Sequence, residues 1–178
     1  TNFDTPPKRA FNGLQFDGTN DLINCGIIGR LNNDSLSALS YVVFLKPDTL
    51  ALGPRIISAW QATGKYSHLF TFSAALTDEF ALGVLGNAAT TTKADVLAGI
   101  WTMIGAEWLK TRATVRFFKN GQPLEELAIA VTGSQTQTAP TVIGQASTMD
   151  NTRIYKGLIA VIYVWNSPML NSPEIMKA

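Results

Sequence analysis

Short runs of β-branched and aromatic residues recur along the whole chain, and most are bounded by proline, glycine or another turn-forming residue. In one of them, residues 69–73, Phe70 and Phe72 fall on the same face of an extended strand. Runs of this length and composition predict β-strands. The other runs of this kind are 40–45, 55–60, 80–85, 100–109, 141–143 and 158–165.

Asn120 followed by Gly121 is the strongest turn signal in the chain. This dipeptide supplies the two positive-φ residues of a type I′ hairpin turn, and strand-forming residues flank it on both sides. We therefore expect a β-hairpin centred on these two residues.

Helix signals are few. Ser172, Pro173 and Glu174 have the order of an N-cap, a first-turn proline and an acidic first turn, which predicts a short C-terminal helix. Segments 88–94 and 132–138 are low in charge, and we expect both to be exposed connections. About ten to twelve short strands indicate an all-β antiparallel sandwich or jelly roll. We expect an N-terminal arm at 1–10 and a single domain at 11–178.

The composition limits the classes of partner. The chain has 178 residues, a net charge of +1 and 15% charged residues, so we expect no nucleic-acid partner. A hydrophobic fraction of 46% with so few charges favours a buried subunit contact and hence a homo-oligomer. No apolar run reaches the roughly 18 residues of a membrane span, and the first residues have no apolar signal-peptide core. These features favour a protein folded in the cytoplasm, with a mature secreted chain as the alternative.

Cys25 is the only cysteine, so no intrachain disulfide can form. A lone cysteine is most often a small buried hydrophobe, and this is what we expect of Cys25. A chain of this length buries enough surface to fold without a disulfide or a metal.

Several segments follow one another in a recognisable order. They include Asp17-Gly-Thr-Asn-Asp21, a Lys46-Pro-Asp48 turn after a strand, a strand led by Trp101 and the Asn120-Gly121 hairpin. In order and spacing they resemble laminin-G-like domains of the concanavalin A-like lectin/glucanase superfamily, with 14–23 as the opening strand pair, 157–166 as the closing strand and 172–175 as the tail helix. The resemblance implies a two-sheet antiparallel jelly-roll sandwich with a concave face. Because this fold hosts many functions, function has to be argued from sites.

Asp17, Asn20 and Asp21 offer hard oxygen ligands of the kind that calcium prefers. The resemblance implies a calcium ion near this strand pair, with a further acidic residue from the closing strand. The matching closing positions are Ala160 and Val161, so half of the acidic set is missing. The alternative is a turn in which the Asx side chains accept bonds from local amides. We prefer the turn and keep weak Ca²⁺ binding as the alternative; no other cofactor is expected.

A glycosidase needs two carboxylates that face each other across the scissile bond. The acidic run that the family's glucanases carry on one strand is absent here. Asp78–Glu79 and Glu125–Glu126 are adjacent pairs, whose side chains point to opposite faces of an extended chain. Glu107 is the only acid inside a confidently predicted strand. We predict no catalytic residue and no enzymatic activity.

Trp60, Tyr66 and His68 cluster around one strand–loop–strand corner and could form a rim on which a glycan stacks. The alternative is ordinary packing or an oligomer contact, and His68 by itself is expected to be a solvated rim residue. The other three tryptophans lie in apolar strands and are interpreted as core or sheet-face residues. They are Trp101, Trp108 and Trp165.

Three functions from different classes remain. The first is a non-catalytic structural protein of an assembled particle, such as a capsid decoration or tail-associated component on a phage or virus surface, whose partners are its own copies or other virion subunits. The second is a carbohydrate-binding or adhesion module, secreted or extracellular, which the resemblance favours. The third is a glycoside-acting enzyme on this scaffold, which lacks a visible catalytic pair.

Overall fold

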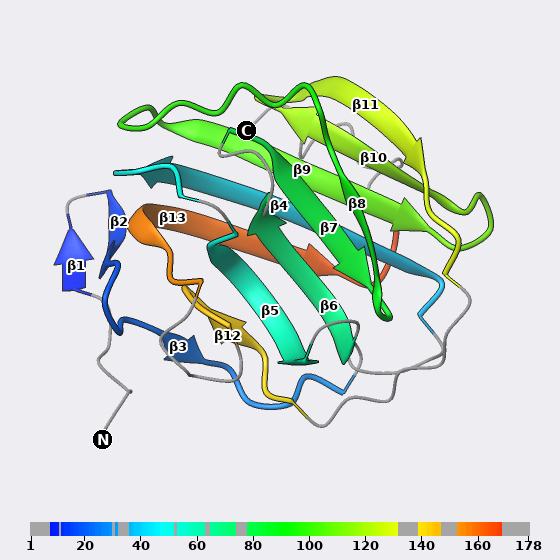
Figure 1. Cartoon of the computed structure of the whole chain (residues 1–178), viewed down its shortest axis with the longest axis horizontal. Coiled ribbons are helices and arrows are strands. Elements are labelled where there is room, and N and C mark those ends of the chain that lie inside the picture. The colour runs from blue at the N-terminus through cyan, green and yellow to red at the C-terminus, as the bar shows by residue number, and fades with distance from the viewer. Residues whose placement is uncertain are drawn as a thin grey trace.

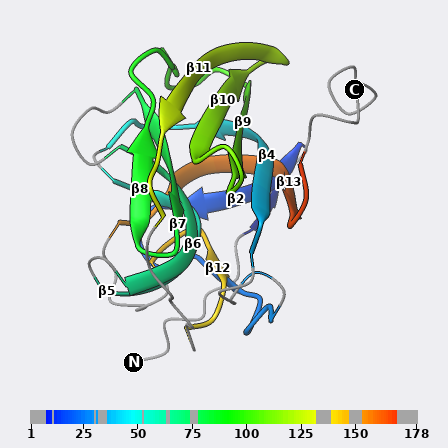
Figure 2. The same cartoon turned by 90° about the vertical axis from the view of Figure 1, so that its right-hand side faces the viewer.

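The computed structural model describes residues 8–10, 12–29, 31, 36–51, 53–62, 65–73, 78–131, 139–146 and 153–168. Within these ranges the chain forms 13 strands and no helix, so no described helix could cross a membrane. The strands build two antiparallel sheets, which lie face to face as the two layers of a sandwich (Figures 1 and 2). The predicted all-β sandwich is therefore confirmed. The predicted C-terminal helix lies outside the described residues.

The larger sheet has seven strands in the spatial order β1-β2-β13-β4-β9-β10-β11. Their bounds are β1 (Lys8–Ala10), β2 (Gly13–Asp17), β13 (Lys156–Trp165), β4 (Ala38–Pro47), β9 (Thr102–Leu109), β10 (Thr114–Lys119) and β11 (Gln122–Ala128). The smaller sheet has six strands in the order β3-β12-β5-β6-β7-β8. Their bounds are β3 (Ile23–Asn24), β12 (Val142–Ile143), β5 (Arg55–Ala62), β6 (Lys65–Phe72), β7 (Phe80–Val84) and β8 (Asn87–Thr90).

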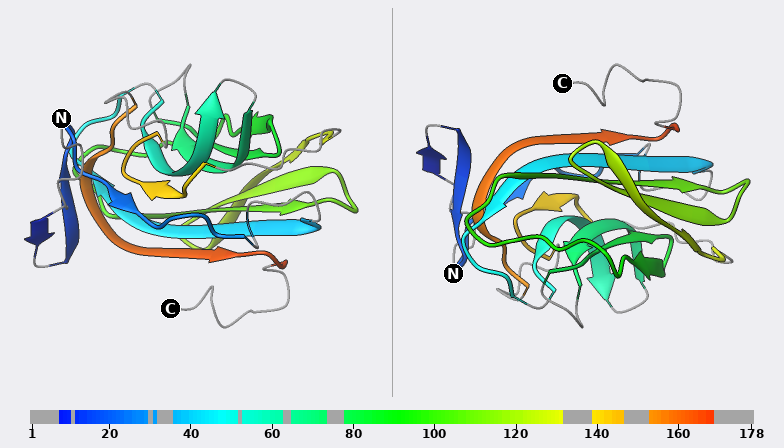
Figure 3. Two further views of the ribbon diagram at one scale, coloured as in Figure 1. Left: turned by 90° about the horizontal axis from the view of Figure 1, so that it is seen from below. Right: turned by 90° about the horizontal axis from the view of Figure 1, so that it is seen from above.

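The core fills the space between the two layers (Figure 3). Tyr41 of β4 stacks on Phe70 of β6 with ring centroids 5.4 Å apart, and Phe80 meets both Phe70 and Phe117 edge-on. Trp108 of β9 is completely buried, which agrees with its prediction as a core or sheet-face residue. Burial of each such side chain contributes about 1.5–3 kcal/mol, which is why alternate positions of β4, β6 and β9 are large and apolar.

The hairpin at Asn120 and Gly121 is confirmed. The two residues have φ angles of 49° and 78°, and they join β10 to β11 with Lys119 paired to Gln122. Both central residues thus have the positive φ of a type I′ turn.

The structure alters two of the predicted boundaries. Segment 88–94 is only in part an exposed connection, because residues 88–90 belong to β8 and Ala89, Thr91 and Ala94 are buried. Residues 8–10 of the predicted arm form β1, which pairs with β2 from Lys8 opposite Gln15. Segment 132–138 and the rest of the arm lie outside the described residues.

Candidate functional site

The outer surface of the seven-stranded sheet carries large apolar side chains that no described layer covers. We define the aromatic face as Phe44, Trp101, Val161, Tyr163 and Trp165. Phe44 is 40% exposed and Tyr163 is 53% exposed. The rings form two stacked pairs: Phe44 with Trp101 at 4.8 Å between centroids, and Tyr163 with Trp165 at 5.6 Å, each with planes 20° apart. Trp165 is a sheet-face residue of β13, in agreement with the interpretation of the tryptophans as core or sheet-face residues, whereas Trp101 directly precedes β9 and reaches this face through its stack on Phe44.

A β-bulge in β13 directs these residues outward. Ile159 pairs with Leu45 and faces the core, whereas Val161 pairs with Phe44 and faces outward, so Ala160 is the extra residue. Beyond the bulge, alternation keeps Tyr163 on the outer face. If β13 kept all its residues but paired regularly with β4, alternation from Ile159 would direct residues 161, 163 and 165 into the core.

Both ends of the aromatic face are defined by chain segments that fold back. At one end Ser167 accepts a hydrogen bond from the Ser40 hydroxyl, 2.8 Å away, so the chain after β13 crosses to β4. At the other end the Gly99 amide donates to the Pro47 carbonyl, which holds the segment before Trp101 against the end of β4. Leu97 and Ile100 in that segment are also exposed, at 60% and 54%.

A second cluster lies on the outer surface of the six-stranded sheet. We define the arginine corner as Arg55, Trp60, Tyr66 and Arg153. The guanidinium carbons of Arg55 and Arg153 lie over the indole ring of Trp60, 5.1 and 5.4 Å from its centroid. The Arg55 amide donates to the Arg153 carbonyl at 2.8 Å, which fixes the two backbones side by side.

Arg55 is only 6% exposed, and its Nη1 donates to Thr71 Oγ1 at 2.9 Å. Burial and this hydrogen bond together hold its guanidinium group in place. Its pKa is lowered to about 10, first by burial and then by the positive charge of Arg153. Burial raises the pKa of Tyr66 to about 12, so its phenol is neutral at physiological pH. A Cβ on Gly83 would lie 2.6 Å from Tyr66 Cε2, so glycine is what lets this ring lie on β7.

The predicted glycan rim of Trp60, Tyr66 and His68 is not an exposed surface. Tyr66 is 7% exposed and His68 is fully buried, so neither ring offers a free face for stacking. Trp60 is half-buried, and its ring is occupied by the two guanidinium groups. The expectation of a solvated His68 is wrong, because His68 alternates along β6 with Phe70 and Phe72 and, like them, faces the core. The register of β5 and β6 shifts by one residue at Ser67, so Tyr66 lies on the opposite face from His68.

The His68 side chain of β6 faces the core and makes two polar contacts, one with Tyr41 of the opposite sheet and one with Thr141, which directly precedes β12. Its Nδ1 is hydrogen-bonded to the Tyr41 hydroxyl and its Nε2 to Thr141 Oγ1, at 3.2 Å. A neutral imidazole satisfies both contacts, because one ring nitrogen donates and the other accepts. Burial lowers the pKa of His68 to about 3, so the ring is neutral at physiological pH.

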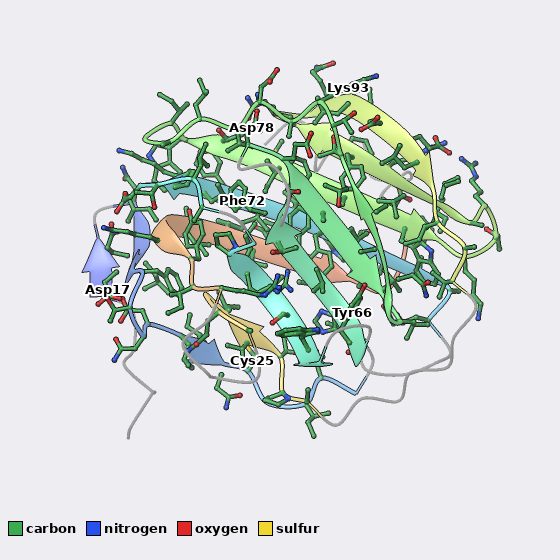
Figure 4. All side chains as sticks on the ribbon, viewed as in Figure 1. Asp17, Cys25, Tyr66, Phe72, Asp78 and Lys93 are labelled. Atoms are coloured by element: carbon green, nitrogen blue, oxygen red, sulfur yellow. The ribbon has the colours of Figure 1, made fainter. Side chains whose placement is uncertain are left out.

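The stretch from Asp17 to Asp21 forms a turn, as preferred from the sequence (Figure 4). Asp17 Oδ1 accepts from the Thr19 amide at 2.7 Å, and Asp21 Oδ2 accepts from the Asp17 amide at 2.8 Å. Gly18 has a φ of 80°, the left-handed conformation that the turn requires. No group of three or more metal-ligating side chains occurs among the described residues. Calcium binding by Asp17, Asn20 and Asp21 stays a prediction.

Glu125 and Glu126 serve local contacts. Glu125 accepts from the Thr92 amide at 2.9 Å, whereas Glu126 forms an ion pair with Arg116 at 2.7 Å, so the adjacent pair does point in opposite directions. Burial and the neighbouring carboxylates of Asp78 and Glu125 raise the pKa of Glu79.

Glu107 is completely buried within β9. Cys25 is exposed, contrary to expectation: it follows β3, the edge strand of the six-stranded sheet, and its amide still donates to the Thr141 carbonyl at 2.8 Å.

Solved structures of known proteins share this fold. A putative carbohydrate binding protein from Bacteroides ovatus superposes with a TM-score of 0.63 at 14% identity, covering 84% of this chain and 42% of that one. The heptameric SAP-like pentraxin of Limulus polyphemus gives 0.65 at 15%, covering 87% and 76%. Domains LG4-5 of the mouse laminin alpha1 chain give 0.60 at 16%, covering 92% and 44%. The chain thus spans less than half the length of the first and third of these proteins.

Among curated protein sequences, none matches the chain. A family model described as the Concanavalin A-like lectin/glucanases superfamily matches residues 17–176, which is most of the chain. The match agrees with the two-sheet architecture and with the resemblance seen in the sequence. The chain belongs to the Concanavalin A-like lectin/glucanases superfamily.

Proposed function

We propose that the protein is a non-catalytic carbohydrate-binding module whose ligand docks on the aromatic face. The observation that carries this proposal is the pair of ring stacks, Phe44 with Trp101 and Tyr163 with Trp165, on an exposed sheet surface. Flat rings held in place by a sheet present apolar surfaces to the C–H faces of pyranose sugars. The Tyr163 hydroxyl and the Trp165 indole N–H supply polar groups at the edge of these rings.

The structural neighbours support this class of ligand, since one of them is itself described as a putative carbohydrate binding protein. Sialidases are also among the neighbours, but they cover 92% of this chain with only 27% of their own length. The described acids Glu125 and Glu126 are engaged in local contacts, which favours binding over hydrolysis.

The same apolar surface suits the homo-oligomer predicted from composition, and this is the competing proposal. One neighbour, the Limulus pentraxin, is heptameric. The placement on a phage or virus surface stays a prediction, because neither the fold nor the named neighbours carry a feature specific to virions.

The test is affinity electrophoresis of the full chain through gels containing neutral polysaccharides, followed by calorimetry with oligosaccharides of whichever polymer retards it. We expect Tyr163→Ala to weaken binding roughly five- to tenfold, since loss of an aromatic stacking partner costs about 1–1.5 kcal/mol. Ile27→Ala is the matched control, because Ile27 is 62% exposed and lies outside the aromatic face.

Equal binding by the Tyr163→Ala and Ile27→Ala variants would contradict the proposal. So would the absence of retardation on every polymer, if light scattering of the same sample showed an oligomer that Tyr163→Ala dissociates. That result would assign the aromatic face to a subunit interface.

A further inference from the structure

The arginine corner brings two positive charges to one place without an acidic partner among the described residues. The guanidinium groups of Arg55 and Arg153 lie over the same Trp60 ring, 5.1 and 5.4 Å from its centroid. Between described residues, the one ion pair joins Arg116 to Glu126, far along the other sheet. The polar side chains near Arg55 are neutral as well: the phenol of Tyr66, whose pKa is raised, and the hydroxyl of Thr71.

The two arginines differ in a way that suits a binding site. Arg55 is held by Thr71 and is only 6% exposed, so its orientation is fixed before any ligand arrives. Its buried Nε has no hydrogen-bond acceptor within the described part of the chain. Arg153 is exposed and can close over a ligand from the solvent side. A buried, charged donor left without an acceptor is costly, and an incoming acceptor relieves that cost.

We propose that the arginine corner binds an oxyanion, a carboxylate or sulfate group of an acidic ligand, between the guanidinium groups of Arg55 and Arg153. Guanidinium is the side chain that matches such groups, because its planar fork donates two parallel hydrogen bonds to two oxygens. The Trp60 ring, 5.1 and 5.4 Å from the two guanidinium carbons, holds both groups near it through cation–π contact. Burial and mutual repulsion depress the pKa of Arg55 to about 10, which is still high enough for both groups to be charged at neutral pH.

This site does not depend on the aromatic face. The arginine corner lies on the outer surface of the six-stranded sheet, where Arg55 pairs with Thr71, whereas the aromatic face lies on the outer surface of the seven-stranded sheet, where Phe44 pairs with Val161. Each proposal can therefore fail while the other stands, and the Tyr163→Ala variant leaves the arginine corner unchanged.

The experiment is a titration of the full chain, monitored by ¹H–¹⁵N correlation of the arginine Nε–Hε groups. Sodium sulfate and sodium acetate are added in separate series, each against sodium chloride at matched ionic strength. We expect saturable shifts of the Arg55 and Arg153 signals with at least one oxyanion and none with chloride. The series that saturates at lower concentration identifies sulfate or carboxylate as the preferred group.

Arg153→Gln is expected to weaken the saturating titration at least about tenfold, because a hydrogen bond between charged groups contributes roughly 1.5–3 kcal/mol. Arg153→Lys keeps the charge but loses the fork, so we expect an intermediate loss. Arg112→Gln is the matched control: it removes an exposed arginine at the turn between β9 and β10 and should leave the titration unchanged.

Three outcomes would overturn the proposal. The first is a shift that grows linearly without saturation, or one equally large at Arg112, which would show only non-specific screening. The second is equal weakening by Arg112→Gln and Arg153→Gln. The third is a parent chain that shows no saturable shift while Asp150→Asn does, since Asp150 is the acidic residue nearest to Arg153 in the sequence and the occupant in the parent chain would then be its own carboxylate.

Discussion

The outer surfaces of the two sheets invert the usual relation between polarity and burial. On the six-stranded sheet Arg55 and Thr71 are polar yet 6% and 3% exposed, and they bond to each other. On the seven-stranded sheet Phe44 and Tyr163 are aromatic yet 40% and 53% exposed. Buried polar groups and exposed apolar groups are the informative exceptions in a folded protein. The contrast shows that both functional proposals lie outside the core, each at a place where burial and polarity disagree.

The largest effect we expect compares an aromatic ring of the core with one of the aromatic face. Phe70→Ala should lower the free energy of unfolding by about 3–5 kcal/mol, since the ring is fully buried between Tyr41 and Phe80. Tyr163→Ala should change it by about 0.5 kcal/mol or less. Urea denaturation of both variants measures the difference. A Tyr163→Ala loss that grows with protein concentration would instead reveal a subunit interface.

A smaller effect tests the polar contact between the two sheets. The pKa of His68 is lowered from 6.5 to about 3, so the folded state binds fewer protons than the unfolded state between these values. The stabilisation is complete above pH 6.5 and is lost as the pH falls toward 3. From pH 7 to pH 4 we expect this group to lower the free energy of unfolding by about 3 kcal/mol.

Urea denaturation across this pH range, on the parent chain and on His68→Gln, isolates the contribution of the imidazole from that of the carboxylates. The variant should be less stable at pH 7 and should show a flatter pH dependence. Identical pH dependence in both chains would show that His68 is not buried in its neutral form.

The smallest effect concerns the buried polar groups of the six-stranded sheet. Thr71→Val removes one hydroxyl that makes two hydrogen bonds. This hydroxyl accepts from Arg55 Nη1 and donates to the Pro54 carbonyl oxygen, 2.7 Å from Thr71 Oγ1. We expect a loss of about 1–3 kcal/mol in the free energy of unfolding. Thr111→Val, at an exposed turn, should change it by about 0.5 kcal/mol or less. A Thr71→Val variant as stable as the Thr111→Val variant would remove the distinction between the two outer surfaces.

The sequence predicted most of the fold and little of the candidate site. Strands such as β4 and the hairpin at Asn120 follow from local alternation and turn chemistry, which a single segment contains. Whether a strand's outward side chains are covered depends on segments far away in the chain. For this reason the sequence alone places His68 at a solvated rim and Ala89 in an exposed connection, whereas both are buried in the structure.

One feature of the sequence indicates the aromatic face. The run 158–165 is apolar throughout, which is typical of a strand buried on both sides. In the structure only one side packs on the core, so the surplus of aromatic residues at 163 and 165 marks the exposed side. Alternation counted from Ile159 would have assigned that side wrongly, because it does not include the bulge.

The bulge at Ala160 also determines how this strand should be compared with relatives of different length. Since Ile159 and Val161 pair with the consecutive residues Leu45 and Phe44, removing Ala160 would leave a regular ladder with the same residues facing outward. A homologue one residue shorter in this strand can therefore present the same surface. In an alignment, the gap belongs inside the strand at Ala160. A gap placed in a neighbouring loop would exchange surface and core positions in one part of β13.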